Sequence, residues 1–293
     1  MRLGIDLGGT KIEAVLLDER GDIHARQRVP TPSHSYSAIL DALQQLVDQL
    51  ESESGGVATV GIGAPGSLSP TTGLMRNSNT TCLNGRPLQR DLERQLGRPV
   101  RIANDANCFV LSEAVDGAAA GAESVFGVIL GTGVGGGLVY RGQLLAGANG
   151  IAGEWGHNRL ADTDQRRPCY CGRYDCIETH LCGAGLLQSY RQLGGQPDSV
   201  PALVTAAEQG EALAQQAMEH YCQALARALA QVINIVDPEV IVLGGGLSNI
   251  ARLYQRVPEL WMQWVFSDHC ATQLRANRFG DSSGVRGAAW LWQ

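Results

Sequence analysis

The sequence predicts an α/β protein in which two similar halves enclose a cleft. The chain has 37 glycines, and 14 of them cluster at the ends of apolar runs, in the stretches GIDLGGTK, VGIGAPGS, LGTGVGGG and VLGGGLS. A pattern of strand, glycine turn and strand occurs twice, and segments with helical apolar spacing follow it. Glycines placed in this way indicate backbone that must approach a ligand closely.

The first half opens with three expected strands. An apolar run at 2–7 ends in the glycine turn 8–11, IEAVLLD follows, and an extended segment reaches Pro30. The short turns between these segments are typical of antiparallel strands. A helix is expected at 36–51, because apolar residues fall at 39, 40, 43, 46, 47 and 50. Further strands are expected at 57–63 and 99–105, the latter leading into a helix at 106–114.

The second half repeats this plan. Residues 124–147 can be laid over the first strands, with Leu130-Gly131-Thr132 matching Leu7-Gly8-Gly9. A long amphipathic helix at about 211–236 ends before Pro238, and the buried strand EVIVL follows. We therefore expect an N-terminal domain of residues 1–118 plus 284–293, and a C-terminal domain of residues 119–283.

The composition narrows the class of protein. The chain is 44% hydrophobic and 18% charged with a net charge of −6, and it has no Lys/Arg-rich patch, so a nucleic-acid partner is not expected. No apolar run reaches the roughly 20 residues of a membrane span, and no signal peptide is recognisable. We expect a cytoplasmic protein without a membrane partner, whose eight cysteines stay reduced.

The glycine turns have a physical interpretation as phosphate sites. Exposed backbone N–H groups form anion-binding concavities, and two facing turns would hold a polyphosphate from both sides. A P-loop is absent, and Gly131-x-Gly133-x-x-Gly136 is followed by strand-like LVY where a dinucleotide fold needs a helix. The alternative, glycines that only serve hairpins, is less favoured because four clusters lie at strand ends.

Two aspartates are candidates for chemistry. Asp6 ends the first strand beside the glycine turn, where a carboxylate suits Mg²⁺ or its water shell, although a simple turn aspartate is an equal alternative. Asp105 lies at a strand-to-helix junction. It is a candidate general base for a substrate hydroxyl, but the sequence alone favours a helix N-cap.

The segment from Gly153 to Glu178 predicts a metal site. His157, Cys169, Cys171 and Cys176 have the spacing H-x11-C-x-C-x4-C, and one His with three Cys is typical of a closed structural zinc site. His180 and Cys182 are rival ligands in the expected next helix. Ligation would fix the nearby Glu154 and Glu178; the alternative is that both are solvated surface acids.

Taken together, these motifs resemble the ROK family of bacterial sugar kinases, named for repressors, open reading frames and kinases. The resemblance covers essentially the whole chain. It rests on seven motifs in order: DLGGTK at 6–11, GIGAPG at 61–66, NDAN at 104–107, LGTGVGGG at 130–137, GEWGH at 153–157, CYCGRYDCIE at 169–178 and VLGGGLS at 242–248.

The resemblance implies an actin/hexokinase-like (ribonuclease H-like) fold, two α/β domains that close over sugar and ATP, and a homodimer. It implies Asp105 as catalytic base, Mg²⁺ as ATP's cofactor near Asp6, and structural Zn²⁺ on the four His/Cys residues. The implied sugar-binding residues are Gly66, Asn79, Asn104, Asp105, Glu154, His157 and Glu178. Those implied for ATP are Gly8, Gly9, Thr10 and Lys11, then Gly131, Thr132 and Gly133, with Gly244, Gly245 and Gly246 on the nucleoside side.

The sequence departs from the family pattern at Asp175, where relatives usually carry the second glycine of CxCGxxGC. If that position needs a positive φ, Asp is among the few tolerable residues. Cys182-Gly183 also replaces the Ser-Gly of many relatives.

For the substrate we expect D-fructose, phosphorylated at its 6-hydroxyl. Residues 64–92 and the C-terminal GDSSGVRGAAWLW resemble fructokinases of the mannofructokinase type. N-acetylglucosamine kinases share NDANCFxLSEA and ILGTGVGGGL and are the main alternative, with glucokinases more distant. A repressor is not expected, because the first strand begins at about Arg2 and leaves no room for a helix-turn-helix. A sugar-binding module without catalysis would be expected to lose Asp105 or a glycine turn; all of these are present, so this class is not favoured.

Overall fold

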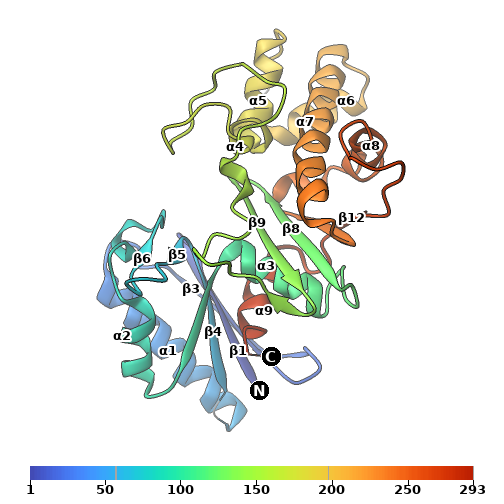
Figure 1. Ribbon diagram of the computed structural model, residues 1–293. Coiled ribbons are helices and arrows are strands. Elements are labelled where there is room, and N and C mark those ends of the chain that lie inside the picture. Colours follow the sequence, from blue (N-terminus) through green and yellow to red (C-terminus); the bar gives the residue numbers. More distant parts are fainter. Residues whose placement is uncertain (57, 197, 293) are drawn as a thin grey trace. The chain divides into compact units, whose positions relative to one another are not determined.

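The computed structural model describes residues 1–56, 58–196 and 198–292 (Figure 1). Its residues divide into two compact units. Unit 1 comprises Met1–Gly121, Gly137–Ala152 and Arg278–Gln293, and unit 2 comprises Ala122–Gly136 and Gly153–Asn277.

Unit 1 contains a five-stranded sheet in the order β3-β2-β1-β4-β7. Its strands are β1 (Arg2–Leu7), β2 (Lys11–Leu17), β3 (Ile23–Pro30), β4 (Thr59–Ala64) and β7 (Val100–Asn104). The first three are antiparallel neighbours, whereas β1, β4 and β7 are parallel. The expected meander and the two later strands are confirmed; Val57, where the expected fourth strand starts, lies outside the described residues.

Helices cover both faces of this sheet. Leu3 and Ile5 are fully buried with residues of α1 (Tyr36–Ser54) and α2 (Leu88–Leu96) in one hydrophobic core. The alternate residues face α9 (Ser283–Ala289): a Cβ at Gly4 would lie 2.2 Å from the Val285 carbonyl oxygen. The remaining elements are α3 (Asp105–Val115), the hairpin of β5 (Ser67–Leu68) and β6 (Met75–Arg76), η1 (Thr81–Leu83) and η4 (Gly280–Ser282).

The second sheet repeats the plan of the first, as the sequence overlay predicts. Its order is β10-β9-β8-β11-β12, which is again third, second, first, fourth and fifth along the chain. The strands β8, β11 and β12 are parallel, and β9 pairs with β10 in antiparallel fashion. Their bounds are β8 (Ser124–Leu130), β9 (Val134–Tyr140), β10 (Gln143–Leu144), β11 (Val240–Gly244) and β12 (Gln273–Ala276).

The unit boundaries differ from the expected domains mainly at residues 137–152, and also at 119–121 and 278–283. The sequence places these residues in the C-terminal domain, whereas the structure groups them with unit 1. The physical reason at 137–152 is a close approach to α3: a Cβ at Gly137 would lie 2.7 Å from Val110 Cγ1 and 2.8 Å from Asn107 Oδ1. The glycine therefore lets β9 lie directly against this helix.

The helices of unit 2 pack around the long α7 (Ala212–Val236). This helix ends at Asp237 with a φ of 47°, immediately before Pro238, so its expected extent is confirmed. Within the described residues, no helix has the length and apolar character to cross a membrane. The other helical elements are η2 (Trp155–His157), α4 (Ile177–Leu181), α5 (Gly183–Gln192), α6 (Val200–Glu208), η3 (Gly246–Asn249) and α8 (Arg252–Trp261).

Candidate active site and metal centre

In unit 1, Asp6 lies on the face of β1 opposite its apolar residues. A Cβ at Gly284 of α9 would lie 3.7 Å from Asp6 Oδ2. The pKa of the Asp6 carboxyl is raised to about 6, chiefly by burial and also by the negative charges of Asp105 and Glu13, against the opposing effect of Lys11. Since Asp6 and Asp105 interact electrostatically, the first strand and the NDAN motif meet in one acidic site.

The turn after β1 is closed by its own backbone. The amide of Gly8 donates to the Lys11 carbonyl at 3.0 Å, and Thr31 Oγ1 donates to the Gly8 carbonyl at 2.7 Å. Gly9, Thr10 and Lys11 are exposed beyond this closure. The amide of Gly8 is thus engaged within the turn, and those of Gly9 and Thr10 are the better candidates for an anion.

The corresponding turn of unit 2 is closed in the same way. The Gly131 amide donates to the Gly133 carbonyl at 3.0 Å, and the Gly183 amide donates to the Gly131 carbonyl at 2.9 Å. Thr132 is exposed at the tip. Nearby, Gly245 has a φ of 80°, and a Cβ there would lie 2.4 Å from the Leu130 carbonyl oxygen. Gly245 of the VLGGGLS motif therefore lies directly against the end of β8.

The structure corrects the assignment of the N-cap of α3. Asn104 is the cap, because its Oδ1 accepts from the Asn107 amide at 2.8 Å. Asp105 is the first helical residue, and its Oδ1 accepts from the Ala106 amide at 2.9 Å. Its side chain is solvent-accessible, yet surrounding protein limits its hydration and raises the pKa of the carboxyl. The assignment of Asp105 as N-cap, favoured by the sequence, is therefore wrong: Asn104 holds the cap position, and Asp105 binds the Ala106 amide of the first turn through Oδ1.

Gly66 lies against residues 76–78 of unit 1, and Asn79 directly follows that segment. Gly66 has a φ of 83°, and a Cβ there would lie 2.4 Å from the Arg76 carbonyl oxygen and 2.8 Å from the Ser78 amide nitrogen. Ser78 is held in turn by two hydrogen bonds with the side chain of Asn84, both 2.9 Å long. Asn79 is exposed directly after this fixed segment.

Unit 2 brings together the four expected metal ligands. One donor atom from each of His157, Cys169, Cys171 and Cys176 lies within 4.8 Å of all the others. His157 Nδ1 lies 3.6 Å from Cys169 Sγ, and Cys171 Sγ lies 3.6 Å from Cys176 Sγ. Tetrahedral Zn²⁺ with bonds of about 2.0–2.3 Å separates its ligands by about 3.5–3.8 Å, so the donor set and its geometry fit zinc.

The rival ligands have other roles. His180 Nε2 lies 3.2 Å from Asp175 Oδ1, and Cys182 Sγ accepts from the Gly185 amide as the N-cap of α5. Of the two ring nitrogens of His157, Nδ1 faces the cysteines and Nε2 lies 2.9 Å from the hydroxyl of Tyr170. Any ligand that contacts Nε2 must therefore share or replace the Tyr170 hydroxyl.

Glu178 is tied to the LGTGVGGG turn and is not a solvated surface acid. Its Oε2 accepts from the Val134 amide at 3.0 Å. A Cβ at Gly133 would lie 2.7 Å from the same oxygen, so the glycine permits this approach. Glu154 is exposed immediately before η2. The segment from His157 to Cys176, called the metal loop below, thus leads directly to one of the two expected carboxylates, Glu178, which lies against a glycine turn.

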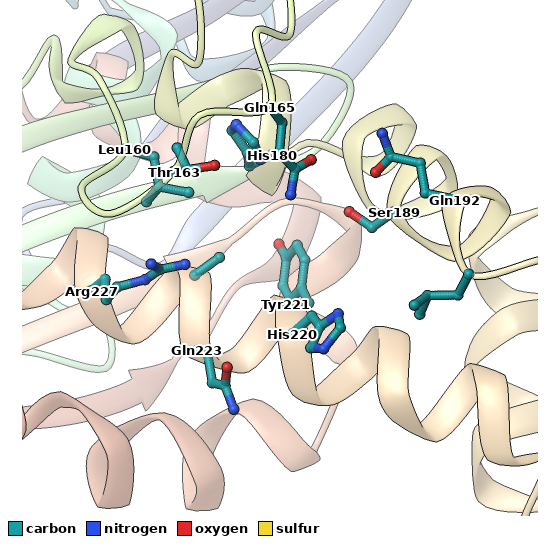
Figure 2. A pocket seen from close by; sticks show the side chains of 12 residues that line it. Leu160, Thr163, Gln165, His180, Ser189, Gln192, His220, Tyr221, Gln223 and Arg227 are labelled. Carbon is teal, nitrogen blue, oxygen red and sulfur yellow. The ribbon is translucent and has the colours of Figure 1, made fainter.

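A separate cavity of about 310 Å³ lies in unit 2 beside the metal loop (Figure 2). Leu160, Thr163 and Gln165 of the loop line it, as do His180 and residues of α5 and α7. Its wall includes Tyr221, whose hydroxyl donates to the Leu181 carbonyl at 2.8 Å. Of the residues that the sequence singled out, the rival ligand His180 lines this cavity, whereas the expected catalytic, sugar-binding, ATP-binding and metal-binding residues do not.

Sequence reasoning missed several residues of the site. Tyr170, between two ligands, gave no signal of its contact with His157, and the backbone amide of Val134 gave none of its bond to Glu178. Asp175 could be noticed only as a departure from the family pattern. Its φ of 54° confirms that this position requires the left-handed conformation.

Two sheets of the same strand order, each with a glycine turn after its first strand, define an actin/hexokinase-like α/β protein. The ROK family model matches residues 2–293. The chain is 39% identical to the N-acetyl-D-glucosamine kinases of Escherichia coli O6:H1 and Vibrio cholerae serotype O1, over 99% of this chain and 99% of each relative. The chain therefore belongs to the ROK family.

Solved structures agree with this assignment. The ROK hexokinase of Thermus thermophilus has a TM-score of 0.89 at 31% identity, covering 99% of this chain and 96% of that chain. A ROK family glucokinase from Streptomyces griseus, in complex with glucose and AMPPNP, has a TM-score of 0.77 at 29% identity, covering 99% and 98%. The fold class expected from the sequence is confirmed.

Proposed function

We propose that the chain is an ATP-dependent sugar kinase that phosphorylates N-acetyl-D-glucosamine at its primary 6-hydroxyl. The observation that carries this proposal is the full-length similarity to N-acetyl-D-glucosamine kinases at 39% identity. The sequence motifs favoured fructose, with N-acetylglucosamine as the main alternative, and these relatives support the alternative. Fructose remains the second candidate, because residues 64–92 resemble fructokinases.

In the proposed mechanism Asp105 is the general base. As the sugar oxygen attacks the γ-phosphorus in line, its proton passes to the Asp105 carboxylate, the new O–P bond forms, and the bond to the ADP oxygen breaks. Because Asn104 caps α3, the Asp105 carboxylate is available for this transfer. Its raised pKa brings the base closer to neutral pH than an ordinary aspartate.

The glycine turns supply the positive ends of backbone dipoles. The exposed amides of Gly9, Thr10 and Thr132 would stabilise charge on the transferring phosphoryl group, with Gly244–Gly246 serving the nucleoside. Bound Mg²⁺ would neutralise part of the phosphate charge, and Asp6 is the carboxylate that would hold it or its water shell.

The residues proposed to bind sugar hydroxyl groups are Gly66, Asn79, Asn104, Glu154, His157 and Glu178. The structural Zn²⁺ would hold His157 by Nδ1 and keep Glu178 in place through the short link from Cys176. A homodimer remains a prediction, which size-exclusion chromatography with light scattering would test.

The substrate assignment is tested by release of ADP with Mg·ATP against N-acetylglucosamine, glucose, fructose and mannose. The Asp105→Asn variant is the control for contaminating kinases. We expect the highest kcat/KM with N-acetylglucosamine. A clear preference for fructose would restore the fructokinase assignment, and turnover of none of the four sugars by the parent would contradict both.

A further inference from the structure

The metal loop contains a buried aspartate in an unusual backbone conformation. Asp175, directly before the ligand Cys176, has a φ of 54° and is 0% exposed. Aspartate tolerates this left-handed region better than most residues but less well than glycine. A residue chosen only for its backbone would be glycine, so the buried carboxylate needs a reason of its own.

The carboxylate of Asp175 ties two segments together. Its two oxygens accept from the backbone amides of Arg166 and Arg167, each at 3.0 Å. Oδ1 also lies 3.2 Å from Nε2 of His180, which is on α4. Burial, with the nearby charge of Arg167, lowers the pKa of His180 to about 4, so at neutral pH its Nε2–H donates this bond.

The backbone of Asp175 adds two further connections. Its amide donates to the Arg167 carbonyl at 2.9 Å, and its carbonyl accepts from the Leu160 amide at 2.8 Å. Leu160 lies shortly after the ligand His157. The two arms of the hairpin that carries Cys169 and Cys171 are therefore joined at their base without any metal.

Arg167 attaches the same end of the hairpin to helices α4 and α5. Its side chain is buried, with only 2% of the residue exposed. Its guanidinium donates to the carbonyls of Thr179 and Gly185, each at 3.1 Å, and to three side-chain oxygens. These belong to Gln165 (2.9 Å), Ser189 (2.9 Å) and Gln192 (2.8 Å). The five bonds use the full donor capacity of an arginine.

We propose that Asp175 is a positioning residue that, with Arg167 and His180, preforms the metal loop before the metal binds. The hydrogen bonds of Asp175, Arg167 and His180, called the clamp below, fix the backbone immediately before Cys176. Glu178 follows two residues after Cys176 and accepts from the Val134 amide. The metal thus meets a prearranged set of ligands and leaves it slowly. The consequence for sugar binding through Glu178 rests on the proposed function; the consequence for metal exchange does not.

Two substitutions separate the carboxylate from the backbone. Asp175→Gly keeps the positive φ and removes all the side-chain bonds. Asp175→Asn keeps the shape but places an amide nitrogen next to N–H donors. Asp164→Asn is the matched control, because this aspartate lies in the same loop with its side chain 83% exposed. His180→Gln provides a second way to weaken the clamp should Asp175→Gly fail to fold.

The primary measurement is the rate at which zinc passes from the folded protein to a coloured chelator. We expect Asp175→Gly, Asp175→Asn and His180→Gln to release zinc about tenfold faster or more, and Asp164→Asn to match the parent. The visible spectrum of the Co²⁺-substituted protein should be unchanged in all variants, because the ligands remain the same. Release rates within about twofold of the parent in all three clamp variants would overturn the proposal.

Calorimetric titration with N-acetylglucosamine supplies a second readout. With metal bound, Asp175→Gly should bind the sugar as the parent does; after chelation both proteins should lose affinity, and the loss should be about tenfold larger in the variant. Equal losses in both chelated proteins would show that the metal alone orders Glu178 and would contradict this part of the proposal. If the parent binds no sugar, the proposed function fails while the zinc-release result stands independently.

Discussion

Replacing Asp6 by asparagine should make the protein more stable while removing its activity. Asp6 is only partly exposed beside Asp105 and Glu13, and its pKa is raised from 3.8 to about 6. The rise of about two units corresponds to about 3 kcal/mol, at 1.36 kcal/mol per unit. Because solvent screens part of this partly exposed group, we expect about 1–2 kcal/mol at neutral pH.

The stabilising effect of Asp6→Asn should depend on pH. Between pH 3.8 and about 6 the folded chain holds a proton on Asp6 that the unfolded chain has lost, so the parent loses stability as pH rises through this window. The advantage of Asp6→Asn should therefore be small near pH 4 and complete above about pH 6.

Urea unfolding in metal-free buffer at pH 4.5 and 7.5, followed by circular dichroism, measures the effect. Asp41→Asn, on the exposed side of α1, removes the same charge and is the matched control. A gain for Asp6→Asn that is no larger than that of the control, or that is equal at the two pH values, would show that burial and charge repulsion do not destabilise the Asp6 carboxylate.

Three further predictions concern the site. Asp105→Asn should abolish turnover while changing sugar affinity by less than about threefold in calorimetry, and near-normal turnover would exclude Asp105 as base. In the parent, kcat/KM should fall on the acid side at a pH above the usual aspartate range, because the raised pKa of Asp105 means that the base is protonated earlier as pH falls. Cys171→Ser should lose zinc, measured by metal analysis, together with thermal stability and sugar affinity, and an unchanged zinc content would contradict the ligand set. Gly133→Ala should raise KM for the sugar about tenfold or more, because its Cβ would lie 2.7 Å from Glu178 Oε2; an unchanged KM would show that Glu178 does not bind substrate.

The repeated fold could be predicted because its signals are local. Apolar runs that end in glycine turns recur at the same spacing, and both sheets follow the same strand order. The metal ligands were equally visible, since all four lie within 20 residues. The N-cap of α3 could not be identified from the sequence, because Asn104 and Asp105 are both good caps and the choice depends on where the backbone becomes helical.

Contacts between distant residues explain what the sequence could not show. Nothing near Arg167 indicates that its side chain is buried against α4 and α5, because five partners spread over 28 residues create that environment. Sugar preference depends in the same way on a few loop contacts, and small differences there change selectivity without changing any motif.

The most direct test of the account is a competition in one tube. The protein receives Mg·ATP with equal concentrations of N-acetylglucosamine and fructose, and mass spectrometry measures the two sugar phosphates at low conversion. Their ratio equals the ratio of the two kcat/KM values. We expect N-acetylglucosamine phosphate to exceed fructose phosphate at least tenfold; an excess of fructose phosphate would contradict the proposed substrate.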